Sequence, residues 1–156
     1  MKIKILCIFI TASVLICTTG TTAIACTSLA VTDKSGNVYH GRTMEFSGQA
    51  PGTLTYFPAG TTIESLTPAN KPGMTFNTKF AILGMTGQLI KKAKQPMVID
   101  GANDQGLSIS ANAMVNSSVQ SPDTDDSKIL SANDFGAWVL GNFQNVGEVK
   151  AAMLSD

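Results

Sequence analysis

The stretch Ala23-Ile24-Ala25-Cys26-Thr27-Ser28 marks the point at which an export signal would end and a folded domain would begin. Before it, Lys2 and Lys4 give a basic start, and an apolar run follows over residues 5–17. This order, closed by small residues in an A-x-A pattern, is typical of a secretory signal peptide. We therefore predict that residues 1–25 are a signal peptide and that the protein is exported, to the periplasm or the medium.

Cleavage between Ala25 and Cys26 would make Cys26 the first residue of the mature chain. Its thiol would then be a nucleophile, and its free α-amine would be a base close to that thiol. An α-amine titrates at about 7.7–8.0, so a good fraction is neutral near physiological pH. Because the thiolate is the reactive form of cysteine, such a base is useful. Removal of the signal would create a catalytic group.

Cys26 also has structural interpretations, since most cysteines are small buried residues or disulfide partners. A disulfide within the mature chain is excluded, because Cys7 and Cys17 belong to the signal. A lipoprotein, in which the cysteine after the cleavage site is acylated, usually has Leu three residues earlier, where this chain has Ala23. The segment by itself leaves a nucleophile, a structural cysteine and a lipidated cysteine open.

The 131 residues that remain after the predicted signal suit one domain, which is long enough to bury a core. Without the two signal lysines, nine basic residues remain against eleven acidic ones, for a net charge of −2. No basic patch indicates nucleic acid, and no second apolar run approaches the roughly 18 residues that span a bilayer. His40 is the single histidine and the sequence has no glycine-rich phosphate loop, so we predict no metal and no cofactor.

The first part of the mature chain has the pattern of β-structure. Two apolar segments, 28–32 and 38–43, flank the turn cluster 33–37, which predicts a hairpin with Cys26 at its open end and residues 42–45 near it. Further strands are expected over 54–57, 61–66, 76–85, 97–99 and 107–111. Residues 67–74, the turn-rich run 100–106, the lysine-rich run 84–95 and the polar run 115–128 are expected to form loops or solvated edges.

Two helices are predicted to close the sequence, which makes the fold class α+β. The first would cover residues 134–140, with Asn133 as its N-cap, Gly141 as its end and Trp138 in the core. The second would run through Leu154 from a capping box at residues 145–148.

Several motifs together resemble the choloylglycine hydrolase family, which comprises penicillin V acylases and bile salt hydrolases within the N-terminal nucleophile (Ntn) hydrolases. The motifs are CTS at 26–28, DKSGN at 33–37, GRTMEF at 41–46, KFAILGM at 79–85, DGANDQGL at 100–107 and WVLGNF at 138–143. The related acid-ceramidase-type amidases open similarly. The resemblance implies an αββα sandwich and a hydrolase that cleaves linear amide C–N bonds of N-acyl compounds through a thioester acyl-enzyme.

The resemblance also implies roles for three residues near the start of the mature chain. Cys26 would attack the amide carbonyl, with its α-amine as the proton shuttle. Arg42 would lie against the thiol and favour the thiolate. Glu45, at a position where the family usually has Asp, would hold the α-amine. Without the resemblance, Arg42 and Glu45 are best interpreted as a surface ion pair after a strand.

The oxyanion of the tetrahedral intermediate also needs hydrogen-bond donors. The family's spacing from Asn103 leads to Ala113, whose backbone N–H would serve, and some members use an Asn side chain there, so the neighbouring Asn112 is a second candidate. Asn103 itself is expected to shape its turn, and His40 is expected to be structural.

Members of the family are more than twice as long as this mature chain, so the resemblance implies an N-terminal fragment of an incomplete sandwich with exposed apolar sheet faces. A second oxyanion Asn and a second Arg would lie in the absent half. The partner would be a small N-acyl amide (a conjugated bile salt, penicillin V or an acylated lactone), and a homo-oligomer of the full-length enzyme stays open. Two alternatives remain: a truncated inactive fragment, and an exported lipid-anchored domain without catalysis.

Overall fold

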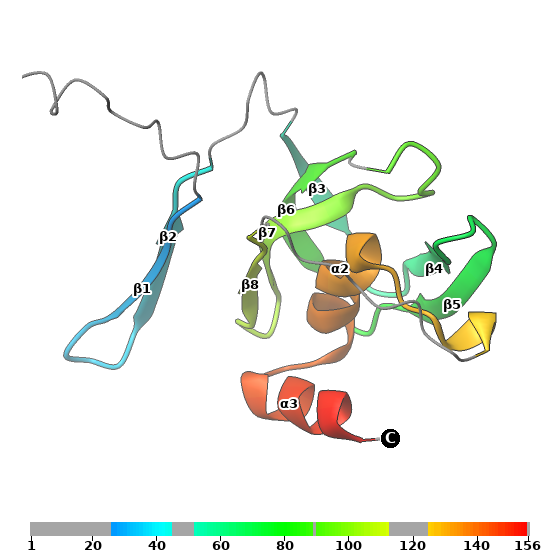
Figure 1. The fold of residues 1–156 in the computed structure, drawn as a ribbon. Helices are drawn as coiled ribbons and strands as arrows, with labels where there is room; N and C mark the ends of the chain where they lie inside the picture. Colours follow the sequence, from blue (N-terminus) through cyan, green and yellow to red (C-terminus); the bar gives the residue numbers. More distant parts are fainter. Residues whose placement is uncertain (1–25, 45–51, 89, 113–124, 156) are drawn as a thin grey trace, which may run out of the picture.

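The computed structural model describes residues 26–44, 52–88, 90–112 and 125–155 of the chain (Figure 1). The predicted signal peptide and the residues Glu45 and Ala113 therefore lie outside the described residues. The elements are, in order, β1 (Ser28–Thr32), β2 (Val38–Arg42), β3 (Thr53–Phe57), β4 (Thr62–Leu66), β5 (Pro72–Asn77), β6 (Ile82–Gly87), β7 (Met97–Asn103), β8 (Ser108–Ser110), the 3₁₀ turn η1 (Asp126–Lys128), α2 (Ala132–Asn142) and α3 (Val146–Leu154). Strands come first and helices last, which confirms the predicted α+β class.

The strands form three antiparallel groups. The central group is a four-stranded sheet with the order β3-β6-β7-β8, while β1 pairs with β2 and β4 pairs with β5 as separate hairpins. Figure 1 shows the β1–β2 hairpin at the β8 edge of the sheet. The β4–β5 hairpin lies on the other side of α2 from the β1–β2 hairpin (Figure 1). The hairpin that carries Cys26 thus lies beside an edge strand, where backbone groups are free to accept new partners.

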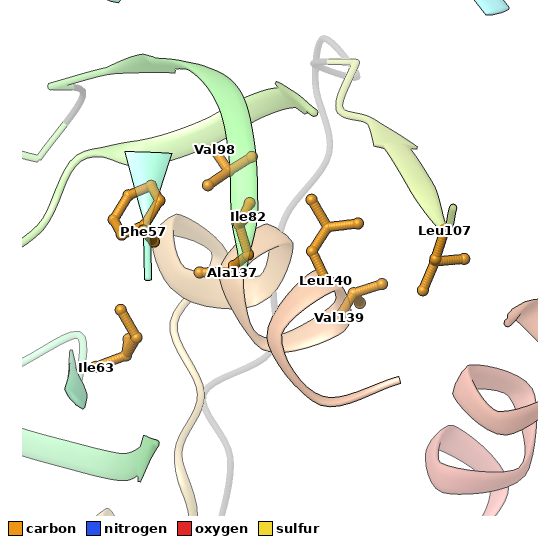
Figure 2. Packing of buried hydrophobic residues seen from close by; sticks show 8 residues of the cluster. All are labelled: Phe57, Ile63, Ile82, Val98, Leu107, Ala137, Val139 and Leu140. Carbon is orange, nitrogen blue, oxygen red and sulfur yellow. The ribbon is translucent and has the colours of Figure 1, made fainter. Parts of the chain in front are cut away.

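Helix α2 covers one face of the four-stranded sheet and forms the core with it. Figure 2 shows Leu140 and Ala137 of α2 directed toward the strand residues Ile82 and Val98, all of them buried. The helix approaches β7 closely at Gly136, where an added Cβ would lie 2.8 Å from the carbonyl oxygen of Val98. A glycine is needed there because any larger side chain would push α2 away from the sheet.

The other face of the sheet is open and apolar. The β3–β6 register places Leu54 opposite Met85 and Tyr56 opposite Leu83, so these four side chains share one face. Their exposed fractions are 73% for Leu54, 63% for Tyr56, 52% for Leu83 and 44% for Met85. Because Asp100 pairs with Met85, its side chain lies on this open face too.

The prediction of a loop over 67–74 and one strand over 76–85 is wrong. Strand β5 begins at Pro72, and a second strand, β6, begins only at Ile82. Proline is tolerated at the first residue of a strand that pairs on one side only, as β5 does with β4. Between the strands, the N–H groups of Lys79 and Phe80 donate to the carbonyl of Gly141, which turns the chain from one hairpin into the sheet.

The prediction of Asn133 and Gly141 as the ends of the first helix is also wrong. The N-cap of α2 is Ser131, and Gly141 lies inside the helix. The amide of Asn133 instead donates to the carbonyl of Gln95 and to the carboxylate of Asp134. Gly141 gives close packing rather than a helix end, since a Cβ there would lie 2.7 Å from Thr78.

The second helix has the predicted capping box. The side chain of Asn145 accepts from the N–H of Glu148 at 3.1 Å, and the Glu148 carboxylate accepts in return from the N–H of Gln144 at 2.9 Å. Trp138 packs against the core and meets the ring of Phe143 edge-on at 4.8 Å between centroids, as its predicted core role requires.

Candidate functional site

The β1–β2 hairpin positions Cys26, and its turn is built as the sequence predicted. One carboxylate oxygen of Asp33 accepts from the N–H groups of Ser35 at 2.8 Å and of Asn37 at 2.9 Å, and Gly36 takes the left-handed conformation at φ 86°. The Asn37 side-chain amide, which donates to the other carboxylate oxygen at 2.9 Å, and these backbone N–H groups lower the pKa of Asp33 below its ordinary value of 3.8. A charged Asp33 therefore fixes the register of both strands.

That register places Cys26 and Arg42 on one face of the hairpin. Ser28 is directly opposite Arg42, and the ladder continues for one residue because the N–H of Thr43 donates to the carbonyl of Thr27 at 2.9 Å. Side chains alternate along extended backbone, so Cys26 lies on the same side as Ser28 and diagonal to Arg42. Cys26 is half-buried and has a free thiol.

Arg42 connects this hairpin to the edge of the four-stranded sheet. Its Nη1 donates to the Ser110 hydroxyl at 3.1 Å and to the carbonyl of Ala111 at 2.8 Å, and its Nε lies 4.0 Å from the Asp100 carboxylate. Only 9% of its side chain is exposed. The side chain of Arg42 therefore does not have the exposed position that a surface ion pair requires, while a pairing with Glu45 lies outside the described residues. The anionic partner of Arg42 among the described residues is Asp100.

The oxyanion candidates follow the same edge strand. Asn112 is exposed and stands two residues after the end of β8, next to the Ala111 carbonyl that Arg42 contacts. The structure thus brings together Cys26, Arg42 and the segment that leads to Asn112. The assigned roles of Glu45 and Ala113 stay predictions.

Asn103 shapes its turn, as expected. Its side-chain oxygen accepts from the N–H groups of Gln105 and Leu107, and its amide donates to the carbonyls of Leu140 and Phe143 at 2.8 and 2.7 Å. His40 is exposed and forms a 3.0 Å hydrogen bond with the Ser28 hydroxyl on the face that carries Cys26.

Other kinds of site receive no support from the described ranges. Within them, no three His, Cys, Asp or Glu side chains gather to hold a metal ion. No helix in the described part of the chain has the length and apolar character needed to cross a membrane. Lys91, Lys92 and Lys94 are exposed, and Lys94 pairs with Glu64, as their predicted solvated position requires.

Comparison with known proteins identifies the family. The model of the linear amide C–N hydrolases, choloylglycine hydrolase family, matches residues 26–155. The chain belongs to the choloylglycine hydrolase family. The match begins at Cys26, at the residue predicted to follow the signal peptide.

Curated relatives of this choloylglycine hydrolase family chain are longer proteins. The bile salt hydrolase/transferase of Clostridium perfringens is 32% identical over 129 residues, which are 82% of this chain and 37% of the relative. The bile salt hydrolase/transferase of Bifidobacterium longum subsp. longum is 28% identical over 132 residues, with coverages of 82% and 38%. The chain therefore spans a little over a third of the length of these relatives.

A solved structure shows the same fold. The crystal structure of a cysteine-to-alanine mutant of the conjugated bile acid hydrolase from Clostridium perfringens matches with a TM-score of 0.63 and 29% identity. The match covers 83% of this choloylglycine hydrolase family chain and 37% of that structure. The predicted Ntn fold is confirmed for this portion.

Asp100 and Ser110 are site neighbours that the sequence analysis did not single out. The sequence predicts a turn-rich run over residues 100–106, whereas β7 extends to Asn103 and puts Asp100 in the middle of a strand. In the sequence, Asp100 is visible only as an acidic residue directly after the apolar segment 97–99. Ser110 is visible only as a hydroxyl residue within the predicted strand 107–111. Neither position indicates an arginine partner that is more than 50 residues away.

Proposed function

We propose that removal of residues 1–25 exposes Cys26 as an N-terminal nucleophile that cleaves the linear amide bond of an N-acyl compound. The observation that supports this most is the register of the hairpin. It puts the single cysteine of residues 26–156 on one face with a largely buried arginine, in a chain of a linear amide C–N hydrolase family. Export to the periplasm or the medium is part of this proposal.

The proposed reaction has two steps. The Cys26 thiolate attacks the amide carbonyl, the C–N bond of the tetrahedral intermediate breaks, and the α-ammonium gives its proton to the leaving amine. Water then attacks the resulting thioester, the neutral α-amine accepts a proton from it, and the carboxylic acid leaves as the C–S bond breaks. The thiolate and the α-ammonium are restored, so atoms and protons balance over the cycle.

Other residues support these two steps in the proposal. Arg42 lies diagonal to Cys26, and its positive charge favours the thiolate over the thiol. Glu45 holds the α-amine. The side chain of Asn112 or the N–H of Ala113 donates to the negative oxygen of the intermediate.

The substrate class follows from the relatives. The similar proteins are named for bile salts and conjugated bile acids, so a conjugated bile salt is the first substrate to test, and penicillin V is the second. The products would be a free acid and an amine. Since the chain spans a little over a third of its relatives, the site in a longer protein would contain further groups.

The test is an assay of amide cleavage by the exported full chain and by Cys26→Ala and Cys26→Ser. Both substitutions remove the thioester route, so the release of amine from a conjugated bile salt or from penicillin V is expected to fall at least about a hundredfold. Cys17→Ser is the matched control, because it removes a cysteine from the predicted signal and leaves the mature chain unchanged.

Three results would overturn the proposal. Full activity of Cys26→Ala would show that another group performs the reaction. No activity of the unchanged chain toward either substrate would favour an inactive fragment, and lipid on Cys26 would favour an anchored domain.

A further inference from the structure

The guanidinium of Arg42 is held by partners from two neighbouring strands. Ser110 and Ala111 belong to β8 and the residue after it, and Asp100 belongs to β7. With 9% of its side chain exposed, Arg42 is shielded from water, so its charge depends on these partners for compensation. The Arg42 side chain is long and has many rotamers, and each of these contacts reduces the number that it can occupy.

Asp100 and Ser110 form one unit. They are directly opposite each other in the β7–β8 register, so their side chains lie on the same face of the sheet. The Ser110 hydroxyl donates to Asp100 Oδ2 at 3.2 Å and accepts from Arg42 Nη1 at 3.1 Å. This hydroxyl therefore links the carboxylate to the guanidinium, while the carboxylate also lies 4.0 Å from Arg42 Nε.

We propose that Asp100 and Ser110 are positioning residues that hold the Arg42 guanidinium beside the face of the hairpin that carries Cys26. The inference rests on the proposed function, because it takes Arg42 as the group that favours the Cys26 thiolate. In this role Asp100 and Ser110 act through Arg42 and not directly on the thiol or the substrate.

The charges around Arg42 make the role of Asp100 testable by sign. A carboxylate that acted only through its negative charge would oppose the thiolate, so its removal would favour the thiolate. A carboxylate that holds Arg42 in place has the opposite effect, because its removal frees the guanidinium. His40 is the other titratable side chain on this hairpin face, and it is bonded to Ser28. It is present in every variant compared below.

The experiment measures the rate of iodoacetamide alkylation of Cys26 against pH in the exported full chain, with the Cys26 peptide followed by mass spectrometry. Arg42→Gln is expected to raise the midpoint of this profile by about one pH unit, which slows alkylation about tenfold at a pH below the midpoint. Asp100→Asn is expected to raise the midpoint in the same direction, and Ser110→Ala to raise it by less.

Three further variants separate positioning from charge and from folding. Asp104→Asn is the matched control, because it removes a nearby carboxylate, in the connection that follows β7, that bonds to Ala81 and Gln105 and not to Arg42, and it is expected to leave the midpoint unchanged. Asp100→Glu keeps a carboxylate and is therefore expected to raise the midpoint by less than Asp100→Asn does. In the Arg42→Gln background, Asp100→Asn is expected to cause no further rise, since Asp100 acts through Arg42.

The outcomes distinguish the two proposals. If Arg42→Gln leaves the midpoint unchanged, the role of Arg42 in the proposed function is wrong. If Arg42→Gln raises it but Asp100→Asn lowers it or leaves it unchanged, the positioning role is wrong and the proposed function stands. If circular dichroism shows that Asp100→Asn does not fold, the midpoint of Ser110→Ala is the test. An unchanged midpoint in Ser110→Ala then overturns the inference.

Discussion

At the scale of single residues, the described site depends on a few side chains that fix backbone register. Asp33 closes the hairpin turn and thereby sets Ser28 opposite Arg42. Arg42 then joins the hairpin to the edge strand β8 through Ser110 and Ala111. A shift of one residue in this register would move Arg42 to the opposite face from Cys26.

The turn at Asp33 is expected to open as the pH falls. Its pKa is lower in the folded chain than the ordinary 3.8, because the Asn37 side chain and backbone N–H groups donate to the charged form. The stabilisation is therefore fully present above the ordinary value and is lost as the pH falls through the lower folded pKa. An NMR titration of the Asn37 and Ser35 amides should give a midpoint below 3.8.

Asp33→Asn is the control for this titration, since it removes the titrating group and should remove the low-pH step in both amides. A midpoint at or above 3.8 in the unchanged chain would contradict the described turn.

The sequence predicted the turn at Asp33 because its signal is a local cluster of turn formers, whereas the place of Arg42 near Cys26 was implied only by the family resemblance. Asp100 and Ser110 were not predicted as partners of Arg42. Their contact depends on the place of the hairpin beside β8, and no local pattern encodes that place.

At the scale of elements, α2 is anchored to the strands through a buried carboxylate at its first turn. Asp134 is 2% exposed and accepts from the hydroxyls of Ser65 and Ser131 and from the amides of Gln95 and Asn133. These partners lie on β4, on the helix start and on the loop before β7. One carboxylate thus connects three segments.

Asp134→Ala is expected to destabilise the chain by about 3 kcal/mol, because four donors lose their charged acceptor inside the protein. The free energy of unfolding in urea measures this loss. Asp126→Ala is the matched control: Asp126 is exposed and pairs at 3.7 Å with exposed Lys71, so a change under about 0.5 kcal/mol is expected. Equal effects of the two substitutions would contradict the anchoring role of Asp134.

The capping box of α3 was predictable because its two residues are three positions apart and bond to each other and to adjacent backbone N–H groups. The start of α2 was not, because Ser131, Asn133 and Asp134 are all good capping residues. Their partners in β4 and in the loop before β7 decide which one caps the helix, and these partners are distant in sequence.

At the scale of the whole molecule, the four-stranded sheet is covered by α2 on one face and is open on the other. The family resemblance implies exposed apolar sheet faces, and the four side chains on the open face agree with this. The sequence does not predict that β3 pairs with β6 while β4 and β5 form a separate hairpin. Apolar alternation identifies strands but does not choose between partners of similar pattern.

The paired substitution Leu54→Thr with Tyr56→Thr is expected to reduce self-association without a loss of stability. Threonine keeps the strand preference of a β-branched residue and removes apolar surface that is already exposed. Light scattering measured across a concentration series, together with urea unfolding, tests both parts.

Leu154→Thr is the control, because Leu154 is 74% exposed on α3, away from the open face of the sheet. An unchanged chain that is already monomeric at every concentration, or a paired variant that associates as strongly as the unchanged chain, would contradict the expected behaviour of this face.

The most direct measurement of the central proposal, a nucleophile created at Cys26 by processing, is the intact mass of the exported chain after rapid acid quench from a conjugated bile salt. We predict a chain that begins at Cys26 and carries one acyl group, which hydroxylamine removes and which peptide mapping assigns to Cys26. A chain that retains residues 1–25, carries lipid on Cys26, or begins at Cys26 but shows no acyl group there with either a bile salt or penicillin V would contradict the account.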